Sequence, residues 1–392
     1  MPEVSEQLKA RLSSKGPKRI LSLDGGGIRG AITIGLLEEI ERLLAERHAA
    51  KGIIDKEKFR LFHYFDLIGG TSTGAIIAAL LAVQGASARE VRQLYLDFGK
   101  QIFSDKNGFN LFGKRIYINR KYDADPLKAQ LDKVFANARL GDDTNKTGLC
   151  IVTKRMDTCS TWPVTNNPAG KFFATNRFFI KDIVRASTAA PSYFEPEIID
   201  VGDGENGIFV DGGLSMMNNP SLQLFMVASL EGFKLQWESG RDRMFIVSLG
   251  TGRRSKKLEG KKWRDPNLLN IAKMAPDQLM ADANELVETM MQLIGDATGQ
   301  VGKIDSEVEE LGNDALNKNK AFSYLRYNVD LSKNTLDSLG ITHLNEEAIA
   351  GLMEMDDAEN LETLMNIGSA AAKEYISEKH FPSLFDLDRV SV

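Results

Sequence analysis

The sequence predicts an α/β protein built on a parallel sheet, and three features lead to that prediction. Apolar runs typical of strands alternate with segments of helical periodicity. Two strands separated by a helix form a βαβ unit, which places both strands in one sheet through a right-handed crossover. Glycine-rich turns follow several strands, at residues 24–30, 70–74, 211–213 and 250–252. In a parallel sheet these turns share the edge where such folds bind ligands.

The composition is that of a large globular domain. The chain has 392 residues, of which 43% are hydrophobic and 26% charged, enough for a sizeable core. A net charge of −5 gives no sign of a nucleic-acid-binding protein. Residues 1–18 lack the apolar core of a signal peptide, and no apolar run reaches membrane-spanning length, so we expect a cytoplasmic protein. Cys150 and Cys159 lack metal-ligand spacing and are expected to be buried reduced thiols.

The N-terminal half contains two strand–turn–helix units. The first strand, residues 19–23, precedes a helix whose apolar residues recur at helical spacing over 31–47. The second, residues 65–68, runs into a helix rich in Ala, Ile and Leu. Ser87 caps a third helix. Asp125 followed by proline begins a fourth, because proline is well tolerated in the first helical turn.

The remaining segments continue the alternation. Residues 104–122 are expected to form a loop, and residues 295–320 a polar, mobile segment. Further strands are expected at 149–153, 171–179, 208–210, 244–249 and 325–331, and further helices at 181–190, 220–230, 268–294 and 346–376.

Ser72 is the candidate nucleophile. It lies in Gly70-Thr71-Ser72-Thr73-Gly74, the G-x-S-x-G spacing of a nucleophile elbow, between a strand and a helix. The chain reverses so sharply in such an elbow that the serine backbone is strained and its Oγ stands clear of the sheet. Gly70 and Gly74 let strand and helix pass without a side-chain clash, and the helix N-terminus favours developing negative charge. A plain strand-to-helix turn is the alternative.

The segment Asp24-Gly25-Gly26-Gly27-Ile28-Arg29-Gly30 has two functional interpretations. Glycines 25, 27 and 30 fit the dinucleotide-binding pattern, but Asp24 would repel a pyrophosphate, and no Walker lysine follows. Alternatively, Gly25, Gly26 and Gly27 expose backbone N–H groups as an oxyanion hole, with each donor worth about 3–4 kcal/mol. Arg29 would brace that loop or attract an anionic head group. A purely structural glycine turn is the third interpretation.

The base for Ser72 is expected to be Asp211. It leaves a strand and precedes two glycines, which keep its carboxylate unobstructed. Burial can raise the pKa of such a carboxyl enough for it to accept a serine proton. None of the four histidines follows a strand as a triad histidine normally would; they are His48, His63, His343 and His380. Asp-Gly is also a common turn pair, and on that pair alone a turn is the better interpretation.

Three ordered motifs, DGGGIRG, GTSTG and DGG, together resemble those of the patatin-like phospholipases, which are acyl hydrolases with a Ser-Asp dyad. The stretches KYDADPL (121–127), ASTAAP (186–191) and SLGTG (248–252) are also similar to that family. The resemblance covers residues 17–252 well and the remainder loosely. It implies a three-layer α/β/α fold with a mostly parallel central sheet. The site residues that it implies are the nucleophile Ser72, the base Asp211, and an oxyanion site of Gly25, Gly26, Gly27 and Arg29.

The function that this resemblance implies is hydrolysis of fatty-acyl esters of phospholipids or lysophospholipids through an acyl-enzyme intermediate. No metal or organic cofactor is implied, and no acidic cage for calcium is evident in the sequence. One alternative within the family is a phospholipase effector of antiphage defence that a cyclic nucleotide activates. An alternative of another class is a non-catalytic lipid-binding or storage protein. The dinucleotide-binding oxidoreductase is a third.

We expect a polar N-terminal tail at 1–16, a catalytic domain at 17–345 and a C-terminal helical extension at 346–392 packed on that domain. Within the catalytic domain, residues 253–320 are a candidate lid or regulatory segment. Basic residues around Trp263 suit an anionic interface, and the methionine-rich helix that follows suits acyl chains. A charged loop with core helices is the plainer interpretation. Transient contact with a membrane surface is expected, a nucleic-acid polymer is not, and the oligomeric state is not predicted.

Overall fold

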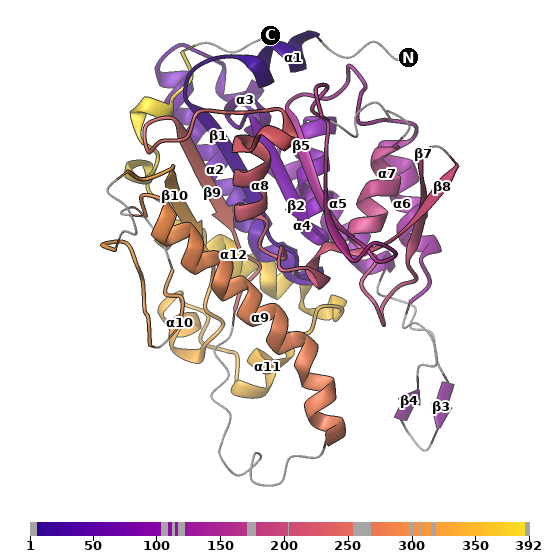
Figure 1. Cartoon of the computed structure of the whole chain (residues 1–392). Coiled ribbons are helices and arrows are strands. Elements are labelled where there is room, and N and C mark those ends of the chain that lie inside the picture. Colours follow the sequence, from indigo (N-terminus) through magenta and orange to yellow (C-terminus); the bar gives the residue numbers. More distant parts are fainter. Residues whose placement is uncertain are drawn as a thin grey trace.

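The structure is a computed structural model of the chain, drawn in Figure 1. The centre of the fold is one eight-stranded sheet. Its strands are β1 (Lys18–Leu23), β2 (Leu67–Thr71), β5 (Gly148–Arg155), β6 (Ser160–Thr165), β7 (Glu197–Gly202), β8 (Glu205–Asp211), β9 (Met244–Leu249) and β10 (Ser323–Tyr327). Their order is β10-β9-β1-β2-β5-β8-β7, with β6 also paired to β5. The run from β10 to β5 is parallel, and β6, β7 and β8 pair antiparallel.

The structure describes most of the chain. The described residues are 6–102, 109–111, 114–116, 122–170, 178–202, 204–253, 268–297, 299, 302–305, 307–314 and 319–388. Within these ranges, no helix is long and apolar enough to cross a membrane. Residues 254–267, which include most of the basic cluster around Trp263, and most of the strand expected at 171–179 lie outside them.

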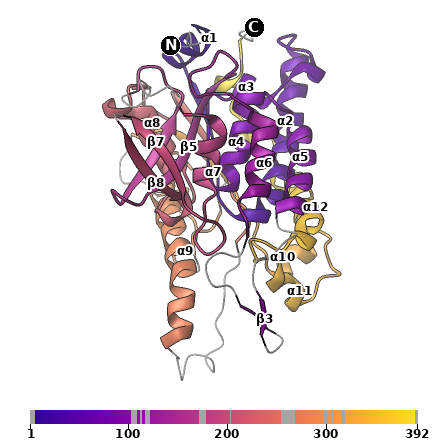
Figure 2. The ribbon, with the colours of Figure 1, turned by 90° about the vertical axis from the view of Figure 1, so that its right-hand side faces the viewer.

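Helices cover both faces of the sheet (Figure 2). One layer contains α2 (Gly30–Ala50), α4 (Thr73–Ala79), α5 (Ala88–Ile102), α6 (Asp125–Phe135), α7 (Ile180–Ser187) and α12 (Leu361–Tyr375). The other contains α1 (Glu6–Ser13), α8 (Ser221–Ser229) and α9 (Leu268–Ile294). Side chains alternate along each strand, so Leu21 and Leu23 enter the first core while Ile20 enters the second. The predicted three-layer α/β/α fold with a mostly parallel sheet is confirmed.

Asp211 reaches the glycine-marked edge from an antiparallel strand, whereas the other three glycine-marked strands, β1, β2 and β9, are parallel. β8 pairs antiparallel with β5, with Asp211 opposite Thr153. The neighbouring pair of β2 and β5 is parallel, with Thr71 opposite Val152. Only the last three residues of β8, Phe209 to Asp211, pair with β5, at its carboxyl end, so β8 ends at the edge where the parallel strands end. Gly212, the next residue, then comes close to Thr71, since a Cβ on Gly212 would lie 3.0 Å from Thr71 Cγ2.

The N-terminal region expected as a polar tail contains the helix α1. Leu8 and Leu12, four residues apart, are buried on one side of it within the second core. The indole N–H of Trp237 donates to the carbonyl of Leu12 at 2.7 Å. Two apolar residues in a single short helix are too few for sequence periodicity to detect.

The C-terminal segment is broken where one continuous helix is expected. α11 (Glu346–Gly351) and α12 are separated by a loop and a short turn, η7 (Ala358–Asn360), which the Asp357 side chain caps. The break brings Met355 onto the glycine loop, where its carbonyl accepts from the N–H of Ile28 at 2.9 Å. α12 packs closely on α2, because a Cβ on Gly35 would lie 2.5 Å from the Gly368 carbonyl carbon.

Two smaller expectations also need correction. The region expected as a loop at 104–122 contains a short antiparallel pair, β3 (Phe109–Leu111) and β4 (Lys114–Ile116). Cys150 is buried in β5 as expected, whereas Cys159 is exposed in the turn that joins β5 to β6.

Candidate active site

Ser72 forms a strained elbow between β2 and α4. Its φ of 54° and ψ of −124° are a conformation that residues with a Cβ rarely adopt. The elbow is tight, since a Cβ on Gly70 would lie 2.1 Å from the Gly74 carbonyl oxygen and one on Gly74 would lie 2.2 Å from that of Leu23. Ser72 is half-buried, while its neighbours Thr71 and Thr73 are buried. The expected backbone geometry of a nucleophile elbow is thus present at this serine.

The ASTAAP stretch holds both halves of the predicted dyad in place. The backbone N–H of Ser72 donates to Ser187 Oγ at 2.9 Å, and Ser187 Oγ donates to the Val152 carbonyl at 2.7 Å. Two residues later, the Ala189 carbonyl accepts from the N–H of Asp211 at 3.0 Å. Sequence reasoning noted this stretch only as part of the resemblance and assigned it no role.

Asp211 is buried next to Ser72, with only 5% of its surface exposed. One carboxylate oxygen accepts from the N–H of Gly213 at 2.7 Å. Burial raises the pKa of Asp211 to about 6, while a hydrogen bond with the Ser72 side chain, the N–H of Gly213 and the charge of Arg185 act in the opposite direction. A carboxyl with a pKa near 6 is ionised at neutral pH and yet basic enough to accept a proton in a catalytic step.

Each histidine has a place away from this pair. The ring of His48 is buried, with Nδ1 2.7 Å from the Leu44 carbonyl. His63 Nδ1 accepts from the N–H of Arg60 at 2.9 Å, and His380 Nδ1 lies 2.8 Å from the Tyr327 hydroxyl. His343 is exposed in the segment before α11. Among the described residues, Asp211 is therefore the titratable group whose side chain bonds to Ser72.

The glycine loop passes directly over the elbow. A Cβ on Gly25 would lie 3.1 Å from that of Ser72. The N–H of Gly25 donates to the Asn218 carbonyl at 3.0 Å, and its own carbonyl accepts from Thr251 Oγ1 at 2.9 Å. Gly25 is thus a close-packed anchor whose N–H is already engaged. Among the described contacts, the N–H groups of Gly26 and Gly27 have no acceptor, so these two remain as candidate oxyanion donors.

Arg29 and Tyr95 hold the glycine loop in place through hydrogen bonds to its carbonyl groups. Arg29 is 7% exposed, and its Nε donates to the Gly26 carbonyl at 3.4 Å, which favours the bracing role over attraction of a head group. The Tyr95 hydroxyl donates to the Gly27 carbonyl and lies 2.6 Å from Thr73 Oγ1. It therefore ties the loop to the first turn of the nucleophile helix. In the sequence, Tyr95 is indistinguishable from the other apolar residues of α5.

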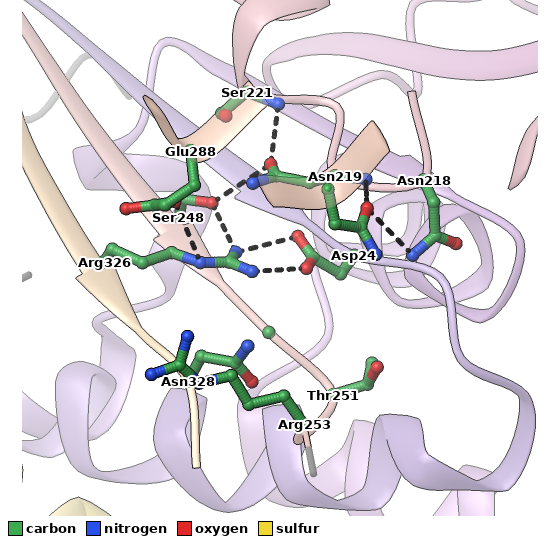
Figure 3. Close-up of polar contacts among 12 residues, drawn as sticks. Asp24, Asn218, Asn219, Ser221, Ser248, Thr251, Arg253, Glu288, Arg326 and Asn328 are labelled. Atoms are coloured by element: carbon green, nitrogen blue, oxygen red, sulfur yellow. Dashed lines mark hydrogen bonds and ion pairs between the residues drawn. The ribbon is translucent and has the colours of Figure 1, made fainter. Parts of the chain in front are cut away.

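The glycine loop contacts protein in the places where a dinucleotide would need space. A Cβ on Gly26 would lie 2.3 Å from Thr251 Oγ1, and one on Gly27 would lie 2.1 Å from the Met355 carbonyl oxygen. Asp24 is buried beneath the loop, where Arg326 binds its two oxygens at 2.9 and 2.6 Å (Figure 3). In the described ranges, no group of three or more His, Cys, Asp or Glu side chains could hold a metal ion.

The sequence was compared with family models and with known proteins, and both comparisons found matches. The family model described as patatin-like phospholipase matches residues 21–225. A protein named cGAMP-activated phospholipase from Vibrio cholerae is 36% identical over 215 residues, which are 53% of this chain and 56% of that protein. A protein of the same name from Escherichia coli is 32% identical over 234 residues, 59% of this chain and 62% of that protein. The chain thus spans less than two thirds of the length of either relative.

Among solved structures, VipD from Legionella pneumophila is 12% identical with a TM-score of 0.31, over 90% of this chain and 67% of that chain. So low a score adds nothing to the assignment. The family model, by contrast, matches more than half of the chain. The matched residues contain the glycine loop, the Ser72 elbow and the strand end at Asp211. The chain therefore belongs to the patatin-like phospholipase family.

Proposed function

We propose that this protein is a serine acyl hydrolase that cleaves fatty-acyl esters of phospholipids or lysophospholipids, with Ser72 as nucleophile and Asp211 as base. One observation carries the proposal. A buried carboxyl with a pKa of about 6 contacts the side chain of a serine that lies in a strained elbow. Such a pair is suited to general-base activation of a hydroxyl nucleophile.

The reaction then has two halves. Asp211 accepts the Ser72 proton as Oγ attacks the ester carbonyl, and the N–H groups of Gly26 and Gly27 stabilise the oxyanion. Collapse breaks the ester bond, and Asp211 returns the proton to the leaving alcohol. In the second half, Asp211 accepts a proton from a water molecule that attacks the acyl-enzyme. Collapse releases the fatty acid, and the proton restores the Ser72 hydroxyl.

The direct test is release of fatty acid from vesicles that contain phosphatidylglycerol, phosphatidylethanolamine and lysophospholipid. Ser72→Ala and Asp211→Asn should each lose at least about 10³-fold in rate, the order found when one member of a catalytic unit is removed. Ser369→Ala is the matched control, because in the described part of the chain that hydroxyl donates within its own helix, to the Met365 carbonyl. Hydrolysis that survives in Ser72→Ala would refute the proposal.

The same experiment distinguishes the hydrolase from the alternative of a non-catalytic protein. A lipid-binding or storage protein would retain lipid from the vesicles and release no fatty acid, with or without Ser72.

We also infer that a cyclic dinucleotide activates the enzyme. The support is the name of the two bacterial relatives, cGAMP-activated phospholipase. The test is fatty-acid release with and without cyclic GMP–AMP, with cyclic di-GMP and 5′-AMP as controls. A sharp increase with cyclic GMP–AMP, and no increase with cyclic di-GMP or 5′-AMP, is expected. Equal rates under all four conditions would contradict this inference and leave the hydrolase proposal intact.

Residues 17–345 are proposed as the catalytic domain, with 346–392 packed on it and 253–320 as a lid that touches the membrane surface. Exposed apolar side chains support that contact. Leu279 and Leu286 on α9 are 67% and 47% exposed, and Leu214 and Met216, just after Asp211, are each 49% exposed. Replacing Leu279 and Met216 with serine should reduce co-sedimentation with anionic vesicles. Unchanged co-sedimentation would reject this surface.

A further inference from the structure

One face of α9 carries two polar side chains that connect to the glycine loop through intermediate residues. Asn284 and Glu288 are four residues apart and therefore lie one above the other on the helix. Through separate contacts they connect to Asp24 and Gly25, the two residues that begin the loop. Both lie beyond residues 21–225, the part matched by the family model.

The first connection is a buried chain of charges (Figure 3). Arg326 of β10 lies between two carboxylates, with Asp24 at 2.6 Å on one side and Glu288 at 3.4 Å on the other. The Tyr324 hydroxyl donates to Glu288 at 2.8 Å, and Gln292 Nε2 donates to its other oxygen at 2.7 Å. Glu288 and Arg326 are 8% and 5% exposed. Hydrogen-bonded charges held this far from water have few alternative arrangements.

The second connection runs through consecutive asparagines. Asn284 Oδ1 accepts from the backbone N–H of Asn219 at 3.1 Å and from the Nδ2 group of Asn218 at 3.5 Å. The carbonyl of Asn218 in turn accepts from the N–H of Gly25 at 3.0 Å. A Cβ on Gly25 would lie 2.4 Å from Asn218 Oδ1, so the asparagine and the loop are in close contact.

We propose that Asn284 and Glu288 are positioning residues, and that the seating of α9 sets the place of the Gly26 and Gly27 donors over Ser72. The proposal rests on the proposed acyl hydrolase function. Oxyanion donors act only within a narrow range of distance from the developing charge, and small displacements caused from a distance can cost about 10²-fold in rate. Because α9 holds Asp24 and Gly25 at the start of the loop, its position controls the distance from the Gly26 and Gly27 donors to the oxyanion. An outward movement of α9 would therefore reduce the rate of hydrolysis without changing the Ser72–Asp211 pair.

The test compares variants at position 284 on a short soluble acyl ester, under conditions in which the wild-type protein hydrolyses it. Reactive sites are counted by fluorophosphonate titration, and kcat is expressed per titrated site. Asn284→Ala removes the acceptor and should lower kcat at least about tenfold, with KM within about threefold. Asn284→Asp keeps an acceptor oxygen for both hydrogen bonds and should stay within about threefold in kcat. Asn284→Ala should still fold, because the side chain is half-buried and alanine favours the helix.

Glu285→Ala is the matched control, since this neighbouring side chain is exposed, and it should leave kcat unchanged. Glu288→Gln is a second arm that removes the charge beside Arg326, and it should also lower kcat at least about tenfold. A smaller fall in Asn284→Ala, or an equal fall in Asn284→Asp, would overturn the proposal. Failure of the wild-type protein to be titrated would instead reject the hydrolase function. A role in stability alone would lower the number of titrated sites and leave kcat per site unchanged.

Discussion

Replacing Asp211 with asparagine should make the protein more stable at pH 8 while abolishing hydrolysis. The carboxyl is buried, and its pKa is raised from 3.8 to about 6 because burial disfavours the charged form. At pH 8 the group is ionised in both the folded and unfolded states, so the folded state bears the cost of a buried charge. Asparagine has nearly the same shape, carries no charge and can still accept the hydrogen bond from Gly213.

The size of the stability gain follows from the shift in the pKa of Asp211. A difference of about two pKa units corresponds to about 3 kcal/mol of unfolding free energy at pH 8. A folded-state pKa above the unfolded value means that this carboxyl's contribution to stability is fully present below pH 3.8 and is lost as pH rises from there through 6. The advantage of the variant should therefore fall to about 0.5 kcal/mol at pH 4. With an unfolding entropy of about 2 cal/mol/K per residue, 3 kcal/mol corresponds to about 4 °C in Tm.

The assay is thermal denaturation of wild type and Asp211→Asn in parallel at pH 4, 6 and 8. We expect the variant to melt about 4 °C higher at pH 8 and the difference nearly to vanish at pH 4. Glu374→Gln, which removes an exposed carboxylate from α12, is the control for pH effects unrelated to Asp211. A variant less stable than wild type at pH 8, or a difference independent of pH, would show that no desolvated carboxylate is present.

Three further predictions concern the same site. The kcat/KM for a soluble ester should rise with pH through an apparent pKa of about 6, because Asp211 must be ionised to act as base, and a profile flat from pH 5 to 7 would exclude that role. Ser72→Gly should be about 1–2 kcal/mol more stable than Ser72→Ala by denaturant unfolding, since glycine relieves the backbone strain at φ 54°; equal stability would mean that the elbow is unstrained. Tyr95→Phe removes the hydroxyl that binds the Gly27 carbonyl and should lower kcat about tenfold with little change in KM, and an unchanged kcat would show that the loop holds its place without it.

The layers of the fold could be predicted from the sequence because they depend on local patterns. β1, β2, β5 and β9 have apolar cores that the sequence shows directly, and their bounds agree with expectation within three residues. The direction of β8 could not be predicted in this way. A short strand carries no local information about the neighbour with which it pairs, and the antiparallel pairing of Asp211 with Thr153 is decided by chain segments far apart in sequence.

The candidate site likewise contains features that local sequence predicts and features that it does not. Motifs whose chemistry depends on adjacent residues, such as the elbow at Ser72 and the glycine loop, are visible because spacing alone defines them. The contacts that set their positions come from distant segments, as with Arg326 on Asp24 and Ser187 on the N–H of Ser72. The local sequence does not distinguish Arg326 from an ordinary polar residue, and Ser187 is marked only by its place in the ASTAAP stretch. The engaged N–H of Gly25 is a further example, since three consecutive glycines appear equivalent until Asn218 is placed beside one of them.

The most direct test of the central claim is labelling with a fluorophosphonate, followed by digestion and mass spectrometry to locate the adduct. The proposed dyad predicts one phosphonylated residue, Ser72, in the wild-type protein. It also predicts that labelling is lost in Ser72→Ala and greatly slowed in Asp211→Asn, because the nucleophile needs its base. An adduct on a different residue, or no adduct in folded protein supplied with lipid and cyclic GMP–AMP, would contradict the account.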